Sequence, residues 1–159
     1  KNQSRSTQDS IKNFSNKIKV AKEAAFSDDF MVIARIESLI LGKSQKDAIN
    51  RAQSYIKAGA DAILIHSKSK NSNEIFKFSK IYKKLNLNKP LVSVPSTYSK
   101  TFEKDLIKNN FQIVIYANHL IRASYKAMSE SAKEILKNKR YKNIEKKISK
   151  ISEVLTLIK

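Results

Sequence analysis

The chain has 159 residues, enough for one domain with a substantial core, and 41% of them are hydrophobic, as in ordinary folded proteins. It contains no cysteine, which excludes disulfides, thiolate metal sites and a cysteine nucleophile within this sequence. Its formal net charge of +18 arises from 32 Lys and Arg against 14 Asp and Glu, and most of the excess is lysine scattered over every predicted helix.

This charge raises the hypothesis of a basic nucleic-acid-binding module, but its distribution disfavours that function. Lysine is a flexible point charge, whereas specific contacts with phosphates and bases favour arginine. We expect neither a nucleic-acid nor a membrane partner, since no apolar run approaches the roughly 20 residues of a membrane-spanning helix. A positive field can still attract a small anionic substrate. The absence of cysteine fits a reducing compartment, and we expect a cytoplasmic protein.

The chain begins with polar residues and continues into a helix and a strand. Residues 1–9 are nearly all polar, and we expect them to be the remnant of a loop. A helix is predicted over residues 10–25, where apolar residues recur at helical spacing. Residues 31–34 form a short apolar run, typical of a strand buried on both faces, which leads into Arg35 and Glu37.

A second helix is predicted to begin at Ser44. Together with Asp47 it forms a variant of the capping box, which satisfies free backbone amides at a helix start. Gly59 stands where the end of a helix favours a left-handed residue. The apolar run 62–65 then predicts the second strand, which ends at His66.

The middle of the chain repeats this pattern twice. A third helix is predicted from residue 71 to residue 85, and a third strand over residues 91–94. A fourth helix is predicted over residues 101–109, and a fourth strand over residues 113–116. Three apolar side chains of the fourth helix are expected to face inward: Phe102, Leu106 and Ile107.

Two helices are predicted after the fourth strand. The first runs over residues 120–137 and is followed by a polar linker, 138–143. The last helix carries a narrow apolar stripe suited to lying on another surface. The stripe consists of Ile144, Ile148, Ile151, Leu155 and Ile158.

Strict alternation of strands and helices predicts a parallel α/β sheet with right-handed crossovers. Repeats of about 20 to 30 residues suit either a (β/α)8 barrel of the TIM type or an open Rossmann-like sheet. Gly42 and Gly59 are the only glycines, so the glycine-rich fingerprint of dinucleotide-binding and P-loop folds is absent. We therefore favour the barrel, of which four β/α units are half.

The polar residues that follow the four strands predict half of an active-site rim, because parallel strands place chemistry at their carboxyl ends. Arg35 invites two interpretations. It can form an ordinary ion pair with Glu37, which lies two residues on and on the same side of the strand. Alternatively, its rigid fork can hold a carboxylate or phosphate, with Glu37 orienting it.

The other candidate residues also leave alternatives open. His66 is either a hydrogen-bonded core residue or a functional group that donates to an anionic oxygen or acts as an acid or base. Ser67 follows it directly, and strand neighbours point to opposite faces, so a Ser–His nucleophile pair is not expected. Asn118 can cap the next helix or contact substrate. No His, Asp or Glu pair has metal-site spacing, so we assign no metal ligand.

Five blocks of sequence carry a family resemblance: FMVIARIES (30–38), AINRA (48–52), AGADAILIHSK (58–68), LVSVPSTY (91–98) and VIYANHLIRA (114–123). In this order and near this spacing they resemble the phosphoenolpyruvate mutase branch of the isocitrate lyase superfamily. The resemblance extends from about residue 10 to residue 157. It implies a TIM-type barrel, with residues 10–137 as its carboxyl-terminal half and residues 138–159 as a terminal helix packed on the barrel or on a partner subunit of a homo-oligomer.

The resemblance also implies an activity: interconversion of phosphoenolpyruvate and phosphonopyruvate, a reaction of phosphonate biosynthesis that uses Mg²⁺. By resemblance, Arg35 holds the anionic groups of the substrate and His66 serves binding and catalysis at its phosphoryl end. Glu37 and Asn118 would hold these two residues in position without contacting the substrate.

The family's catalytic aspartate, magnesium ligands and Lys-x-Asn-Ser gating loop would precede residue 1, so we expect the chain alone to be inactive. Phosphonopyruvate hydrolase is the main alternative, because it shares the arginine and histidine blocks. A carbon–carbon lyase of the superfamily is less favoured, since that branch tends to place an acidic residue at the position of His66.

Overall fold

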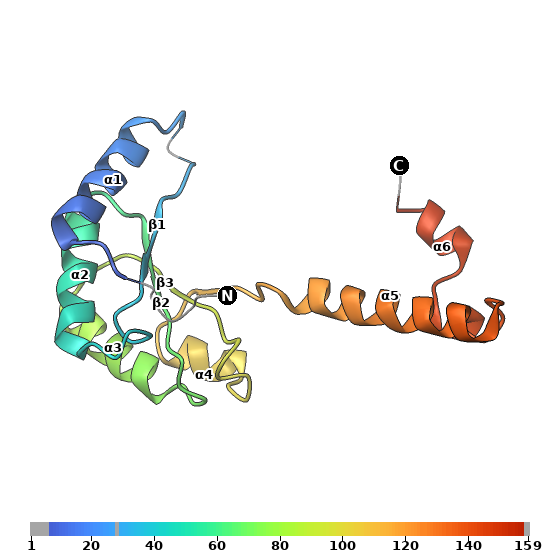
Figure 1. Cartoon of the computed structure of the whole chain (residues 1–159). Helices are drawn as coiled ribbons and strands as arrows, with labels where there is room; N and C mark the ends of the chain where they lie inside the picture. Colours follow the sequence, from blue (N-terminus) through green and yellow to red (C-terminus); the bar gives the residue numbers. More distant parts are fainter. Residues whose placement is uncertain (1–6, 28, 158–159) are drawn as a thin grey trace. The chain divides into compact units, whose positions relative to one another are not determined.

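A computed structural model describes residues 7–27 and 29–157, and the chain forms two compact units that divide between Ala117 and Asn118. The first unit alternates helices and strands, as Figure 1 shows. Its elements are α1 (Ile11–Glu23), β1 (Ile33–Ile36), α2 (Gln45–Lys57), β2 (Ala62–Ile65), α3 (Asn73–Lys84), β3 (Leu91–Ser93), α4 (Glu103–Lys108) and β4 (Ile113–Val114). The second contains α5 (His119–Asn138), the 3₁₀ helix η2 (Glu145–Lys147) and α6 (Ile151–Leu155).

The described strands form one parallel sheet in the order β1-β2-β3-β4. Arg35 pairs with Leu64 across β1 and β2, Leu64 pairs with Val92 of β3, and Val92 pairs with Ile113 of β4. Each strand therefore lies beside the next one in the chain, which confirms the parallel sheet predicted from the alternation. Because all strands run the same way, the residues after β1, β2 and β3 lie at one edge of the sheet.

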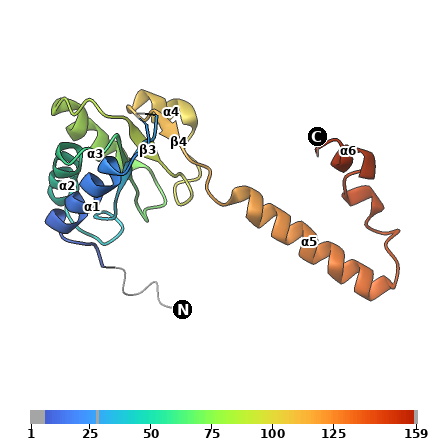
Figure 2. The ribbon, with the colours of Figure 1, turned by 90° about the horizontal axis from the view of Figure 1, so that it is seen from above.

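The two faces of the sheet have different surroundings. Helices α1, α2 and α3 lie along one side (Figures 1 and 2) and cover the main core. This core contains alternate strand residues and aromatic side chains of the helices, among them Ala34, Ile36, Ile63, Ile65, Leu91, Tyr55, Phe78 and Tyr82. The other face holds a smaller cluster of Ala62, Leu64, Val92 and Val94, with Ile113 packed against it. Alternation along β1 places Arg35 on this second face.

Helix α2 begins and ends as its sequence predicts. The Ser44 hydroxyl accepts a hydrogen bond from the backbone amide of Asp47 at 3.1 Å. Gly59 follows the C-cap residue Ala58 with a φ of +106°. This φ favours glycine, and a Cβ there would stand 3.3 Å from Cγ of Lys22. The sharp end of α2 sets where β2 starts, and hence where His66 falls.

Four elements of the first unit differ from their predicted form. Strands β3 and β4 end at Ser93 and Val114, before the predicted residues 94 and 116. Strand β1 begins at Ile33 rather than residue 31 and includes Arg35, so the arginine lies within the strand. Its residues alternate between exposed and buried, so the prediction of a strand buried on both faces is wrong for β1.

Helix α4 has only six residues, and Leu106 is its one buried side chain among the described residues. Phe102 and Ile107 are 67% and 68% exposed, so the prediction that both face inward is wrong. A helix of fewer than two turns directs only one apolar position to the sheet.

The second unit differs from prediction near its end. The predicted last helix is divided: η2 ends at Lys147, the next residue Ile148 has extended dihedral angles (φ −116°, ψ 157°), and α6 begins at Ile151. Ile148 is β-branched and lies among lysines, a combination with low helix propensity. Of the predicted stripe, Ile144 is buried, and Ile148, Ile151 and Leu155 are exposed. Ile158 lies outside the described residues.

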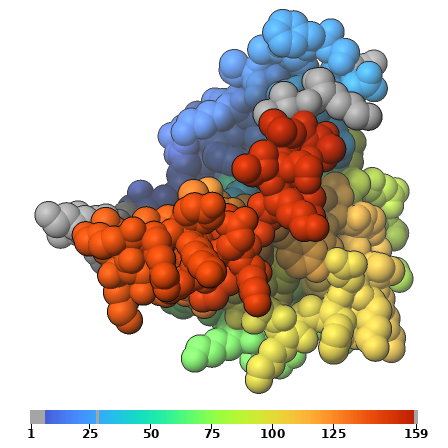
Figure 3. All heavy atoms as spheres, turned by 90° about the vertical axis from the view of Figure 1, so that its right-hand side faces the viewer, coloured from blue at the N-terminus to red at the C-terminus, as the bar shows by residue number. Residues whose placement is uncertain are grey.

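Helix α5 has twenty residues, and none of them is buried in the described chain. Apolar side chains recur on its exposed surface: Leu120, Ile121, Tyr125, Met128, Ile135 and Leu136. Figure 3 shows this unit as the orange and red spheres. None of the helices in the described residues is long and apolar enough to cross a bilayer.

Candidate active site

Arg35 and Glu37 form an ion pair at the carboxyl end of β1. Nε of Arg35 donates to Oε1 of Glu37. The arginine side chain remains 49% exposed and the glutamate side chain 33% exposed. The structure thus shows the ion pair and leaves about half of the arginine side chain exposed. A planar cation fixed on one side by a carboxylate can use its remaining N–H groups for an anion.

His66 follows the last residue of β2 and is half-buried. Its Nδ1 atom is buried and has no hydrogen-bond partner among the described residues. Burial lowers the pKa of His66, the positive charge of Arg35 lowers it further, and Glu37 opposes them in part. The ring is therefore neutral at pH 7, and Nε2 is the nitrogen available to a ligand.

These three predicted residues come together at one edge of the sheet. Arg35 pairs with Leu64, two residues before His66, and the charges of Arg35 and Glu37 both act on the histidine. Arg35 supplies a positive charge beside the neutral ring, and the alternation along β1 places it on the face away from the main core. Such an arrangement suits an anionic ligand.

Asn118 lies in the second unit, at the N-cap position of α5 as predicted. Its side chain makes no capping hydrogen bond within the described chain. The backbone explains this: Asn118 has φ −128° and ψ 11°, whereas side-chain capping favours the extended region. Its supporting role in a site stays a prediction.

Polar residues around Ser67 form a hydrogen-bond network behind His66 that the sequence did not predict. Ser67 is fully buried, and its hydroxyl donates to the carboxylate of Glu74 at the start of α3. The Ser69 amide donates to the Ser67 hydroxyl at 2.9 Å, and the Thr97 hydroxyl donates to the Ser67 carbonyl at 2.7 Å. Ser67 is thus a buried residue whose hydroxyl and carbonyl are both engaged in hydrogen bonds within the fold. Ser67 lies in the loop after β2 and Glu74 in the first turn of α3, seven residues later, a spacing that carries no periodic signal in the sequence.

A second polar network supports the loop after β1. Ser38 is fully buried, and its hydroxyl donates to Oδ2 of Asp47 at 2.6 Å. Arg51, which is 5% exposed, donates to the same carboxylate at 3.1 Å and to the Tyr55 hydroxyl at 2.8 Å. Burial alone would raise the pKa of Asp47, but the hydrogen bonds from Ser38 and Arg51 outweigh it and hold the pKa below its usual value. This network fixes α2 behind the Arg35–Glu37 pair.

The described residues do not form a magnesium site. They contain no group of three or more His, Cys, Asp or Glu side chains that could hold a metal ion. Glu37, the carboxylate nearest the candidate site, is engaged by Arg35. Magnesium requires several oxygen ligands in octahedral geometry, which this part of the chain does not supply.

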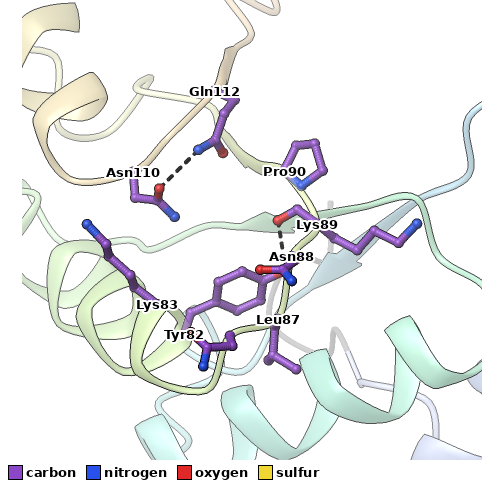
Figure 4. Close-up of a pocket in the computed structure, with 9 residues that line it drawn as sticks. Tyr82, Lys83, Leu87, Asn88, Lys89, Pro90, Asn110 and Gln112 are labelled. Carbon is purple, nitrogen blue, oxygen red and sulfur yellow. Dashed lines mark hydrogen bonds between the residues drawn. The ribbon is translucent and has the colours of Figure 1, made fainter.

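A cavity of about 470 Å³ lies away from the candidate site, between the loops that precede β3 and β4 (Figure 4). Its lining residues are Tyr82, Lys83, Asn86, Leu87, Asn88, Lys89, Pro90, Asn110 and Gln112. The carboxyl ends of α3 and α4 point to these loops, and their carbonyl dipoles disfavour an anion. Gln112 instead contributes to structure, donating to Asn110 at 3.2 Å and accepting from the Leu91 amide at 2.8 Å. The cavity therefore lies at the amino-terminal edge of the sheet, opposite His66.

Comparison with known proteins identifies the family. A sequence model described as "Phosphoenolpyruvate phosphomutase" matches residues 1–136. The chain belongs to this family. A phosphoenolpyruvate phosphomutase of Tetrahymena pyriformis is 39% identical over 147 residues, and a phosphonopyruvate hydrolase of Variovorax sp. is 39% identical over 148. Each match covers 92% of this chain but 48% and 50% of the relative, so the chain spans about half the length of these family members.

Solved structures of family members show the same fold. The crystal structure of a phosphoenolpyruvate phosphomutase from Streptomyces platensis subsp. rosaceus matches with a TM-score of 0.89 at 38% identity, covering 96% of this chain and 52% of that chain. Phosphonopyruvate hydrolase complexed with oxalate and Mg²⁺ matches with a TM-score of 0.87 at 38% identity, covering 99% of this chain and 56% of that chain. The predicted parallel α/β fold of the TIM-barrel type is confirmed, with this chain corresponding to about half of the family's enzyme chain.

Proposed function

We propose that this chain forms the anion-holding side of the active site of a phosphoenolpyruvate mutase, which interconverts phosphoenolpyruvate and phosphonopyruvate. One observation carries the proposal. The partly exposed guanidinium of Arg35, held by Glu37, lies beside a neutral, half-buried His66 at the carboxyl edge of a parallel sheet. In barrels of this type that edge carries the chemistry.

The residues have complementary roles in this proposal. Arg35 binds the anionic oxygens of the substrate through N–H groups that Glu37 leaves free, and Glu37 orients the guanidinium. His66 donates a hydrogen bond from Nε2 to a phosphoryl oxygen, because its Nδ1 is buried. Both contacts stabilise negative charge while the phosphoryl group moves between the enol oxygen and the methylene carbon of pyruvate.

The structure of a relative, a phosphonopyruvate hydrolase, contains Mg²⁺ and oxalate. We propose that the enzyme formed with this chain also requires Mg²⁺. The described residues lack a suitable ligand group, so its ligands would come from outside them. For the same reason we expect residues 1–159 by themselves to bind an anion weakly and to show no turnover, and turnover by this chain alone would contradict that expectation.

Phosphonopyruvate hydrolase is the second candidate, because a hydrolase and a mutase are equally similar to this chain at 39% identity. The products distinguish them. Phosphonopyruvate with Mg²⁺ should give phosphoenolpyruvate if the protein is a mutase, and pyruvate with free phosphate if it is a hydrolase. The assay requires the whole enzyme that contains this chain, with both products measured in the same reaction.

Arg35→Lys tests the anion-holding role. The substitution keeps the charge but removes the planar fork, so we expect phosphonopyruvate affinity to fall about tenfold or more. Isothermal titration or NMR titration of the chain measures this loss. Arg140→Lys in the second unit is the matched control and should bind as the unchanged protein does. Equal affinity for all three proteins would remove Arg35 from the site.

We also propose that the second unit mediates homo-oligomerisation. Helix α5 is fully described and has no buried residue, while large apolar side chains recur along it and along α6. Contiguous exposed apolar surface of this kind marks sites of protein association.

A further inference from the structure

The loop that follows β3 contacts the candidate site at two points. Thr97 and Tyr98 are adjacent in this loop, far in sequence from His66. Thr97 is exposed, whereas Tyr98 is fully buried. Thr97 bonds to the backbone just after His66, and Tyr98 contacts the histidine ring. The loop therefore constrains both the main chain and the side chain of this region.

Tyr98 packs against the ring of His66. The two ring centroids are 6.0 Å apart and the planes are tilted by 53°, a favourable arrangement for aromatic side chains. The Tyr98 hydroxyl is buried without a hydrogen-bond partner in the described chain. Burial raises the pKa of Tyr98 to about 12, which the nearby Val94 backbone opposes in part. The hydroxyl is therefore neutral, and the contact with His66 is made by the ring.

Thr97 fixes the backbone. Its hydroxyl donates to the Ser67 carbonyl at 2.7 Å, while the Ser67 hydroxyl donates to Glu74. Gln45 of α2 donates in turn to the Glu74 carbonyl at 2.9 Å. Ser67 thereby links the loop after β3 to Glu74 of α3, and Glu74 in turn contacts the first residue of α2. A loop tied at several points loses less conformational entropy when a ligand binds.

We propose that Thr97 and Tyr98 are positioning residues that hold His66 in its ligand-binding orientation, Tyr98 through its ring and Thr97 through the Ser67 carbonyl. The catalytic consequence of this positioning rests on the proposed function. The contacts of Thr97 and Tyr98 do not depend on that function. The charged and titratable groups that act on His66 are Arg35 and Glu37 from the β1 side, and Tyr98 is the titratable group from the β3 side.

NMR titration of the imidazole signals of the whole chain tests the proposal. The chain has two histidines, and His119→Gln assigns the signals. Tyr98→Leu keeps an apolar filler but removes the ring, so water should reach His66 and its pKa should rise towards 6.5. Tyr98→Phe keeps the ring that packs on His66 and should leave the pKa of His66 unchanged. A pKa of His66 that is the same in Tyr98→Leu, or raised equally in Tyr98→Phe, would overturn the role of the ring.

Thr97→Val provides an independent test that spares the core. It removes one hydrogen bond at an exposed position, so the Ser69 amide should exchange with solvent about tenfold faster and the His66 signals should shift. Ser99→Ala, an exposed residue of the same loop, is the matched control and should change neither. Unchanged exchange and unchanged His66 signals in Thr97→Val would overturn the role of Thr97. These readouts need no turnover, so failure of the proposed reaction is a separate result.

Discussion

At the scale of single residues, the chemistry of the candidate site depends on neighbours rather than on residue type. Glu37 orients the guanidinium of Arg35 through their ion pair. Burial and the positive charge of Arg35 lower the pKa of His66 and so keep its ring neutral. A neutral histidine can donate a hydrogen bond to an anion without adding a second positive charge beside the arginine. The ion pair and the anion-binding role of Arg35, which the sequence left as alternatives, are compatible, since half of its side chain stays exposed.

His66 should make folding stability depend on pH in a defined direction. Its folded pKa lies below 6.5, so the unfolded chain binds more protons in acid. Stability is therefore lost as pH falls through 6.5, and the loss levels off below the folded pKa. His66→Gln should lose less stability than the unchanged chain between pH 7.5 and 5.5, measured by urea unfolding. Parallel curves for the two proteins would contradict this.

At the scale of elements, α2 connects the fold to the site. Its N-cap bond at Ser44 and its Asp47–Arg51 pair fix the helix against the loop after β1. Arg51 is nearly fully buried and bonds to Asp47, to Tyr55 and to the Asp9 carbonyl. Such a buried cation is tolerated only because its N–H groups find partners.

Asp47→Asn should therefore destabilise the protein by about 1–3 kcal/mol at pH 7, because the buried Arg51 loses its counter-charge. The folded pKa of Asp47 is lowered, so its stabilisation exists above pH 3.8 and disappears as pH falls through the folded value. Denaturant unfolding at pH 7 and near pH 3 should show the difference between the two proteins shrinking in acid. The control is Asp29→Asn, which replaces an exposed carboxylate. It should leave the free energy of unfolding unchanged at both pH values.

At the scale of the whole molecule, two units of different character share the chain. The first buries a core beneath a parallel sheet, whereas α5 and α6 expose most of their large apolar side chains. A helical unit that buries so little of its apolar surface gains little stability from its own packing. Association with another copy would supply the missing burial, in keeping with the proposed homo-oligomer.

The double variant Leu136→Lys, Leu155→Lys tests this association. Both leucines are exposed, at 67% and 64%, so neither change should unfold the first unit. Charge in an apolar interface is costly, and we expect the sedimentation coefficient to fall to that of a monomer. Lys126→Gln and Lys137→Gln on α5 together form the control and should sediment as the unchanged chain does. A monomeric unchanged chain, or a variant that remains oligomeric, would contradict the proposal.

The alternation of strands and helices, the α2 cap, the Gly59 turn and the place of His66 after a buried run are all readable from the sequence alone. These features depend on local periodicity and on residue preferences that act over a few positions. The exposure of Phe102 and Ile107 was not predictable in this way, because it depends on how short α4 is and what lies opposite it.

The residues that support the site become apparent only once the elements are packed together. Thr97 and Tyr98 reach His66 and Ser67 across about thirty residues of chain, and Glu74 joins them from α3. Ser38 likewise meets Asp47 and Arg51 only because β1 and α2 pack together. The physical reason is that hydrogen-bond and ring contacts act over a few ångströms, so they depend on how separate elements pack and leave no periodic signal in the sequence.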